Sequence, residues 1–213
     1  DSSVKANFTS TNVTAVRGRI VTALTNVRQA MRNAGYADGS WTLVVQDYPS
    51  PIPPASGFRY SQSGYTRQST GGCGFWNRDA DWANATALPT INSTVKSAVT
   101  ASGIAGAKIL ELQSAFNGRR LCENTVGLLE EKGLTSWTQA GAVDKSEWID
   151  QIRTVSTLGS NYYVQESLHP NYWGQLAERS CVRQVWNGGT PRGGTCTISG
   201  SGLLAGEPRM ALS

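Results

Sequence analysis

The amino-acid sequence predicts an α/β fold, a three-layer α/β/α domain around a parallel sheet, of which this chain supplies about half. Two short apolar runs, over 41–46 and 106–112, are unbroken, as is typical of strands buried on both faces of a parallel sheet. Helical patterns precede and separate these runs, which is the alternation of a βαβ fold. Two strands are too few for such a sheet, so we expect an N-terminal partner segment to complete it.

The first part of the chain predicts a helix, a strand and a long loop. Over 12–34, apolar residues recur at spacings of three and four, as in an amphipathic helix, and Gly35 ends the pattern. The strand at 41–46 stops at a proline-rich segment. Residues 48–79 have no periodicity and predict a loop that Cys73 ties down in part.

Helix, strand and loop then alternate a second time. A helical pattern fits 80–102, where Pro89 is expected to break or restart the helix. The second strand, at 106–112, is followed by an irregular stretch over 113–143. A further helix is predicted over 144–156, with its large apolar residues facing inward.

The C-terminal part predicts one more helix and a tail. The helix spans about 170–187 and ends at Gly188 and Gly189. Residues 190–213 are rich in Gly, Ser and Thr and predict a tail with modest strand propensity at its centre. Residues 1–213 together are expected to form the C-terminal part of a single domain, because the first helix has no strand before it.

Composition excludes several classes of protein. With 39% apolar and 16% charged residues, the chain has the composition of a globular domain rather than a disordered one. The formal net charge is +4, and the basic residues are scattered without a long run, so we expect no nucleic-acid partner. No apolar stretch is long enough for a transmembrane segment.

The four cysteines predict disulfide bonds. They are Cys73, Cys122, Cys181 and Cys196. The chain has neither a Cys-x-x-Cys pair nor a second histidine, so we expect no metal ion and no cofactor. Of the three possible pairings, proximity in sequence favours Cys181 with Cys196 and Cys73 with Cys122. Disulfides imply an oxidising environment, and so a secreted, extracellular protein.

The only histidine of the chain lies in the segment QESLHPNYWGQ, residues 165–175. Pro170 restricts His169 to an extended backbone and suits the first turn of a helix, so His169 is expected at a loop-to-helix junction. Glu166, three residues earlier, could accept a hydrogen bond from the ring and fix its tautomer. The alternative is that His169 only helps to cap the helix while Glu166 is solvated.

Three segments carry a resemblance to a known family. The segment ESLHPNYWGQLAERSCVRQ resembles the last sequence block of SGNH/GDSL hydrolases, an Asp-x-x-His-Pro segment followed by a helix, particularly in secreted actinomycete-type esterases and lipases. TLVVQDYPSPIP resembles the family's strand that ends in Tyr-Pro, and AKILELQSAFNGRRLCE its next strand and cysteine-containing loop. The similarity extends over about residues 12–187, and its specific motif is the histidine block.

The resemblance implies an SGNH/flavodoxin-like sheet and a role for each residue of the block. His169 would be the general base that deprotonates a serine and later protonates the leaving alkoxide. Glu166 takes the place of the family's orienting aspartate, which is one methylene shorter. Some members of the family orient the histidine through a backbone carbonyl instead.

The family's other motifs, Gly-Asp-Ser and Gly-x-Asn-Asp, do not occur in this sequence. We therefore expect an obligate partner chain, the N-terminal half of the same enzyme, which carries the Ser, Gly and Asn of the site. The predicted function is that of a secreted, processed two-chain esterase or lipase, which hydrolyses small-molecule or lipid esters through an acyl-enzyme. The alternatives are a non-catalytic binding or structural module and a carbohydrate O-acyl esterase or transferase.

Overall fold

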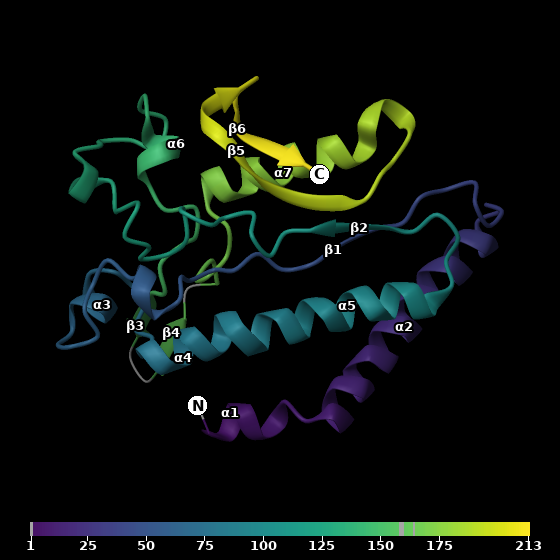
Figure 1. The fold of residues 1–213 in the computed structure, drawn as a ribbon, viewed down its shortest axis with the longest axis horizontal. Coiled ribbons are helices and arrows are strands. Elements are labelled where there is room, and N and C mark those ends of the chain that lie inside the picture. Colours follow the sequence, from purple (N-terminus) through teal and green to yellow (C-terminus); the bar gives the residue numbers. More distant parts are fainter. Residues whose placement is uncertain (1, 158–159, 164) are drawn as a thin grey trace.

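A four-stranded sheet with helices on both faces forms the centre of the protein in a computed structural model, which describes residues 2–157, 160–163 and 165–213 (Figure 1). The strand order is β1-β2-β5-β6. The pairs β1–β2 and β2–β5 are parallel, and β5–β6 is antiparallel. The α/β class and the mostly parallel sheet are therefore as predicted.

The helices and strands have the following bounds. The sheet consists of β1 (Val44–Gln46), β2 (Lys108–Glu111), β5 (Gly194–Leu204) and β6 (Glu207–Leu212), and a separate antiparallel pair consists of β3 (Thr154–Thr157) and β4 (Ser160–Tyr163). The α-helices are α1 (Ser2–Asn7), α2 (Ser10–Asn33), α3 (Thr66–Ser69), α4 (Asn77–Trp82), α5 (Leu88–Ser102), α6 (Ala142–Lys145) and α7 (Tyr172–Trp186). Shorter helical turns are η1 (Ala55–Gly57), η2 (Ala83–Ala87), η3 (Glu130–Lys132) and η4 (Asn187–Gly189).

The two faces of the sheet bury different clusters of side chains, because neighbouring residues of a strand point to opposite faces. Ile109 of β2 packs with Leu24 of α2 and Val99 of α5. Leu110, the next residue, belongs to the main core together with Ala177 of α7. In Figure 1, α2 and α5 lie on one side of the strands and α7 on the other.

The helical region predicted at 80–102 consists of three consecutive segments. α4 is followed by the π-helical turn η2 and then by α5. Pro89 is the second residue of α5, directly after the π-helical turn in which Leu88 N donates to Ala83 O, so its missing N–H falls where the α-helical hydrogen-bond pattern is already interrupted. The break or restart of the helix expected at Pro89 is therefore present only as a π-helical turn within a continuous helical backbone.

The helix predicted over 144–156 is wrong. Helix α6 ends at Lys145, and residues 146–153 are not helical. Their backbone bonds distant segments instead: Trp148 N donates to Arg119 O at 2.8 Å, and Ile152 N donates to Gly72 O, also at 2.8 Å. These long-range bonds and the burial of Trp148 outweigh the local helical pattern.

The C-terminal residues form part of the sheet rather than a tail. β5 and β6 are a hairpin, and β5 inserts beside β2. A Cβ atom at Gly193 would lie 2.7 Å from Ile109 O, so the glycine before β5 permits this close approach. Met210 and Leu212 of β6 are buried in the main core.

Both predicted disulfides are present. Cys73 is bonded to Cys122, and Cys181 is bonded to Cys196. The first bridge joins the segment after β1 to the segment after β2, and the second joins α7 to β5. No helix in the described part of the chain is long and apolar enough to cross a membrane.

We expect Gly174→Ala to destabilise the fold, because the first turn of α7 packs directly on the backbone of Trp148. The new Cβ would overlap the carbonyl oxygen of Trp148 and lie 2.8 Å from Pro170 Cβ. The free energy of unfolding should fall by about 1–3 kcal/mol, as measured by urea denaturation.

The matched control is Gly18→Ala in the middle of α2, where a Cβ meets no atom within 4 Å. This variant should gain about 0.5–1 kcal/mol, because alanine has less conformational entropy to lose in a helix. Equal effects at the two glycines would contradict the packing seen at Gly174.

Candidate functional site

A ladder of backbone hydrogen bonds places His169 beyond the carboxyl ends of the parallel strands. The segments that follow β1 and β2 are joined where Ser50 N donates to Gln113 O at 3.1 Å. The segment after β2 continues to Arg119, whose carbonyl oxygen accepts a hydrogen bond from Trp148 N. Two residues later, Asp150 N donates to His169 O at 2.9 Å. Open α/β sheets bind their ligands at this edge.

A tight turn presents the histidine. His169 N donates to Glu166 O at 2.9 Å, which closes a four-residue turn. Its third residue, Leu168, has a φ of 64°, a left-handed conformation that glycine normally supplies in turns. Leu168 is held by a hydrogen bond from its N–H to Asp150 O and by packing against the core. Tertiary contacts therefore maintain a strained backbone next to His169.

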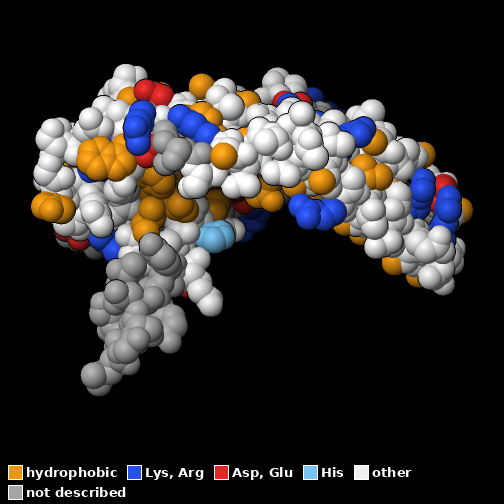
Figure 2. Space-filling view, turned by 90° about the horizontal axis from the view of Figure 1, so that it is seen from below, with side chains coloured by type: hydrophobic (Ala, Val, Ile, Leu, Met, Phe, Trp, Pro, Cys, Tyr) orange, Lys and Arg blue, Asp and Glu red, His pale blue; other side chains and the backbone are white. Residues whose placement is uncertain are grey.

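The imidazole of His169 is oriented by a backbone carbonyl. Its Nδ1 lies 3.1 Å from Ser167 O, and since a carbonyl can only accept, Nδ1 carries the proton in the neutral ring. Nε2 then has a lone pair available for a proton. Figure 2 shows the histidine side chain, in pale blue, at the surface. In the described residues, no hydroxyl or carboxylate is hydrogen-bonded to this ring.

Two carboxylates lie close to the histidine, and sequence reasoning found only one of them. Glu166 is exposed at the start of the turn, and no hydrogen bond joins it to the ring in the part of the chain that the structure describes. Asp150 lies opposite His169 on the paired segment. Burial raises the pKa of Asp150, Glu166 raises it further, and His169 lowers it. Asp150 therefore interacts electrostatically with Glu166 and with His169.

An open cavity adjoins the turn on the side of the two carboxylates. Its volume is about 340 Å³, and its wall combines charged and apolar side chains. Asp150 and Glu166 line it together with Trp137, Ile149 and Arg153. The cavity can therefore receive a ligand that has both polar and apolar parts.

Helix α7 begins later than predicted. Its N-cap is Asn171, whose side-chain oxygen accepts from Trp173 N at 3.1 Å and Gly174 N at 3.4 Å. Pro170 therefore precedes the cap instead of lying in the first turn, and it pairs with Ile149. Asparagine is among the best N-cap residues, a signal in the sequence that could have located this boundary.

No group of three or more His, Cys, Asp and Glu side chains is placed to hold a metal ion within the described ranges. Searches for similar proteins found no matching family model, curated protein or solved structure. The roles of His169 and Glu166 therefore remain predictions from the resemblance.

The carboxyl group of Asp150 is expected to make stability depend on pH. Because its pKa is raised in the folded protein, the fold binds this proton more tightly than the unfolded chain does. The ionised group is therefore destabilising at neutral pH, and the cost disappears as the pH falls through the folded pKa towards the unfolded value. Asp150→Asn should be more stable than the wild type at about pH 7, by a margin that shrinks towards about pH 4.

Urea unfolding at the two pH values measures this margin. Asp38→Asn is a control of opposite sign, because the hydrogen bond from Arg32 lowers the pKa of Asp38. That variant should lose stability at neutral pH, and its loss should shrink in acid. A margin for Asp150→Asn that does not change with pH would contradict the expected titration.

Proposed function

We propose that this chain carries the general base of a secreted serine ester hydrolase of SGNH/GDSL type, and that its histidine is the catalytic residue. The observation that carries the proposal is the position and orientation of the His169 ring, which lies beyond the carboxyl ends of the parallel strands. Its Nδ1 is fixed by Ser167 O, while Nε2 is left to accept a proton at an exposed position. General bases need this combination of a fixed tautomer and an accessible lone pair.

The proposed reaction is acyl transfer in two steps. Nε2 takes the proton of a serine hydroxyl while the serine oxygen attacks the ester carbonyl, and the imidazolium then returns the proton to the leaving alkoxide. Water repeats the sequence on the acyl-enzyme and releases the acid. Ser167 O, which faces Nδ1, stabilises the imidazolium.

The acids near the ring act as positioning residues in this proposal. The backbone N–H of Asp150 is hydrogen-bonded to His169 O, and His169 lowers the pKa of the Asp150 carboxyl group through its charge. Glu166 has the position of the family's orienting aspartate, and its exposed carboxylate lines the adjoining cavity. The ester would bind in that cavity, where the partly exposed Trp137 supplies apolar surface.

The serine and the oxyanion-hole donors come from an N-terminal partner chain in this proposal. The two disulfides fit an extracellular location, because such bonds persist in oxidising compartments.

Ester hydrolysis by the chain with and without the N-terminal polypeptide tests the function. We expect turnover of p-nitrophenyl esters only when both are present. A serine-directed fluorophosphonate should label the partner, as determined by intact mass. An assembled complex that neither hydrolyses these esters nor reacts with the fluorophosphonate would instead support a non-catalytic binding module.

A further inference from the structure

Strand β1 has one paired side and one open side. Lys108 N donates to Leu43 O at 2.8 Å, and Asp47 N donates to Leu110 O at 3.0 Å. The odd-numbered residues in and next to β1 therefore form the backbone hydrogen bonds with β2. Alternate residues of a strand direct their peptide groups to opposite sides. The N–H and C=O groups of Val44 and Gln46 therefore point away from β2, where no strand pairs with them among the described residues.

The face of the sheet above β1 is also uncovered. Leu43 and Val45 pack beneath β1 towards α2 and α5. On the other face, the side chain of Val44 is 41% exposed and Gln46 is exposed as well. α7 packs over β2 and β6, farther along the sheet.

Helix α2 indicates what belongs at this edge. It lies beside α5 on the same face of the sheet (Figure 1). α5 is the crossover between the parallel strands β1 and β2, and such crossovers are right-handed. Helix α2 lies on this same face and leads into β1. It therefore has the position of a right-handed crossover from another parallel strand, and that strand would lie on the open side of β1.

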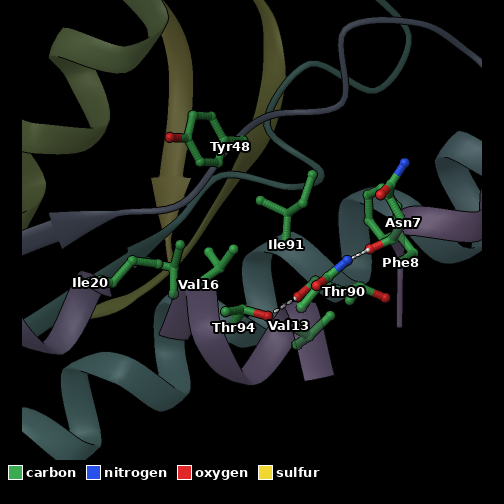
Figure 3. A pocket seen from close by; sticks show the side chains of 11 residues that line it. Asn7, Phe8, Val13, Val16, Ile20, Tyr48, Thr90, Ile91 and Thr94 are labelled. Atoms are coloured by element: carbon green, nitrogen blue, oxygen red, sulfur yellow. Dashed lines mark hydrogen bonds between the residues drawn. The ribbon is translucent and has the colours of Figure 1, made fainter. Parts of the chain in front are cut away.

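Helix α2 itself is incompletely buried. Leu24 is its only buried residue within the described chain, and the apolar side chains of Val16 and Val27 are 38% and 43% exposed. An apolar cavity of about 270 Å³ opens between the N-terminal halves of α2 and α5, next to Tyr48 just beyond β1 (Figure 3). The open edge of the sheet, its uncovered face and the apolar cavity therefore all lie next to β1.

We infer that the open edge of β1 binds a strand of the N-terminal partner, parallel to β1 and hydrogen-bonded to the peptide groups of Val44 and Gln46. The face of this strand that meets α2 should be apolar, because it is buried against the helix. The same partner segment fills the α2–α5 cavity with apolar side chains. The identity of the partner rests on the proposed function, whereas the geometry of the edge does not.

The parallel direction has a consequence for the active site. The carboxyl end of the added strand reaches the same edge of the sheet as the segments that position His169. The partner's serine and oxyanion-hole donors would be delivered to this edge if they follow its strands, which is where side chains for ligand binding gather in α/β sheets.

Two substitutions block this edge while leaving the pairing with β2 in place. Gln46→Pro removes an N–H that points to the open side, a position at which an edge strand tolerates proline. Val44→Lys places a charge on the uncovered face. The matched control is Val182→Lys on α7, whose wild-type side chain is 44% exposed.

Titration of the full chain with the N-terminal polypeptide measures the effect. Gln46→Pro and Val44→Lys should each weaken binding at least about tenfold, equivalent to about 1.4 kcal/mol, while Val182→Lys binds like the wild type. Amide hydrogen exchange in the wild-type complex should show protection of Val44 and Gln46 that the isolated chain lacks.

The outcomes separate the inference from the proposed function. If the amides of Val44 and Gln46 are protected in a complex that does not hydrolyse esters, the proposed function would be refuted, while the inferred strand pairing at β1 would stand. Unprotected amides, or wild-type binding by both edge variants, would overturn the inference even if the complex is active. Absence of binding, or pairing of β1 with a second copy of this chain, would overturn it as well.

Discussion

His169→Ala is expected to lower the ester turnover of the assembled enzyme by about 10²–10⁴-fold, the usual contribution of a general acid–base residue. The proposed role of the side chain depends on Nε2, whereas its structural role is small because it is exposed. The backbone hydrogen bonds of residue 169 to Glu166 O and from Asp150 N do not involve the ring. Stability should therefore be unchanged.

The measurement is kcat for a p-nitrophenyl ester, with the midpoint of thermal unfolding recorded for each variant. Gln165→Ala, an exposed change in the same segment, serves as control and should retain full activity. Glu166→Gln and Asp150→Asn should lose less activity than His169→Ala, because each acts on the base through charge or position. Near-wild-type turnover by His169→Ala would exclude the proposed role.

The elements that were predicted best have a strong local pattern of their own. The helices at α2, α5 and α7 and the strands β1 and β2 follow from apolar periodicity, which reflects how each element is buried. Even here the environment modifies the outcome. Leu110 of β2 is fully buried, whereas Val44 of β1 lies at an edge, although the two apolar runs are alike in sequence.

The elements that were mispredicted depend on distant partners. The segment that contains Trp148 and Ile149 has a helical pattern in its sequence. Its backbone, however, pairs with residues near 119 and 170. The hairpin of β5 and β6 is rich in small residues, and its strand character comes from pairing with β2 and from the bridge at Cys196. Neither partnership leaves a periodic signal in the local sequence.

The candidate site shows the same division. His169 and Glu166 belong to one short motif, so the sequence brings both to notice. Asp150 is 19 positions before His169 in the chain and approaches it through backbone pairing. The left-handed conformation of Leu168 could not be predicted either, since leucine rarely adopts it and tertiary contacts maintain it here.

Removing the Cys73–Cys122 bridge should have the largest effect on stability among the changes considered. Both cysteines are fully buried in the main core, and they are 49 residues apart. The bridge restricts the unfolded chain by closing this long loop, which the chain-entropy model values at about 4 kcal/mol. The double variant Cys73→Ala/Cys122→Ala should lose free energy of unfolding of this order in urea denaturation.

The Cys181–Cys196 bridge provides the comparison, since it closes a loop of only 15 residues. The same model assigns it about 3 kcal/mol, so Cys181→Ala/Cys196→Ala should lose about 1 kcal/mol less than the other double variant. The folded state favours the same order. β5 and β6 keep their ladder to each other and to β2 without the second bridge, whereas the segments around Cys73 and Cys122 have little regular secondary structure. A larger loss from the shorter loop would show that native-state contacts, rather than loop closure, determine what each bridge contributes.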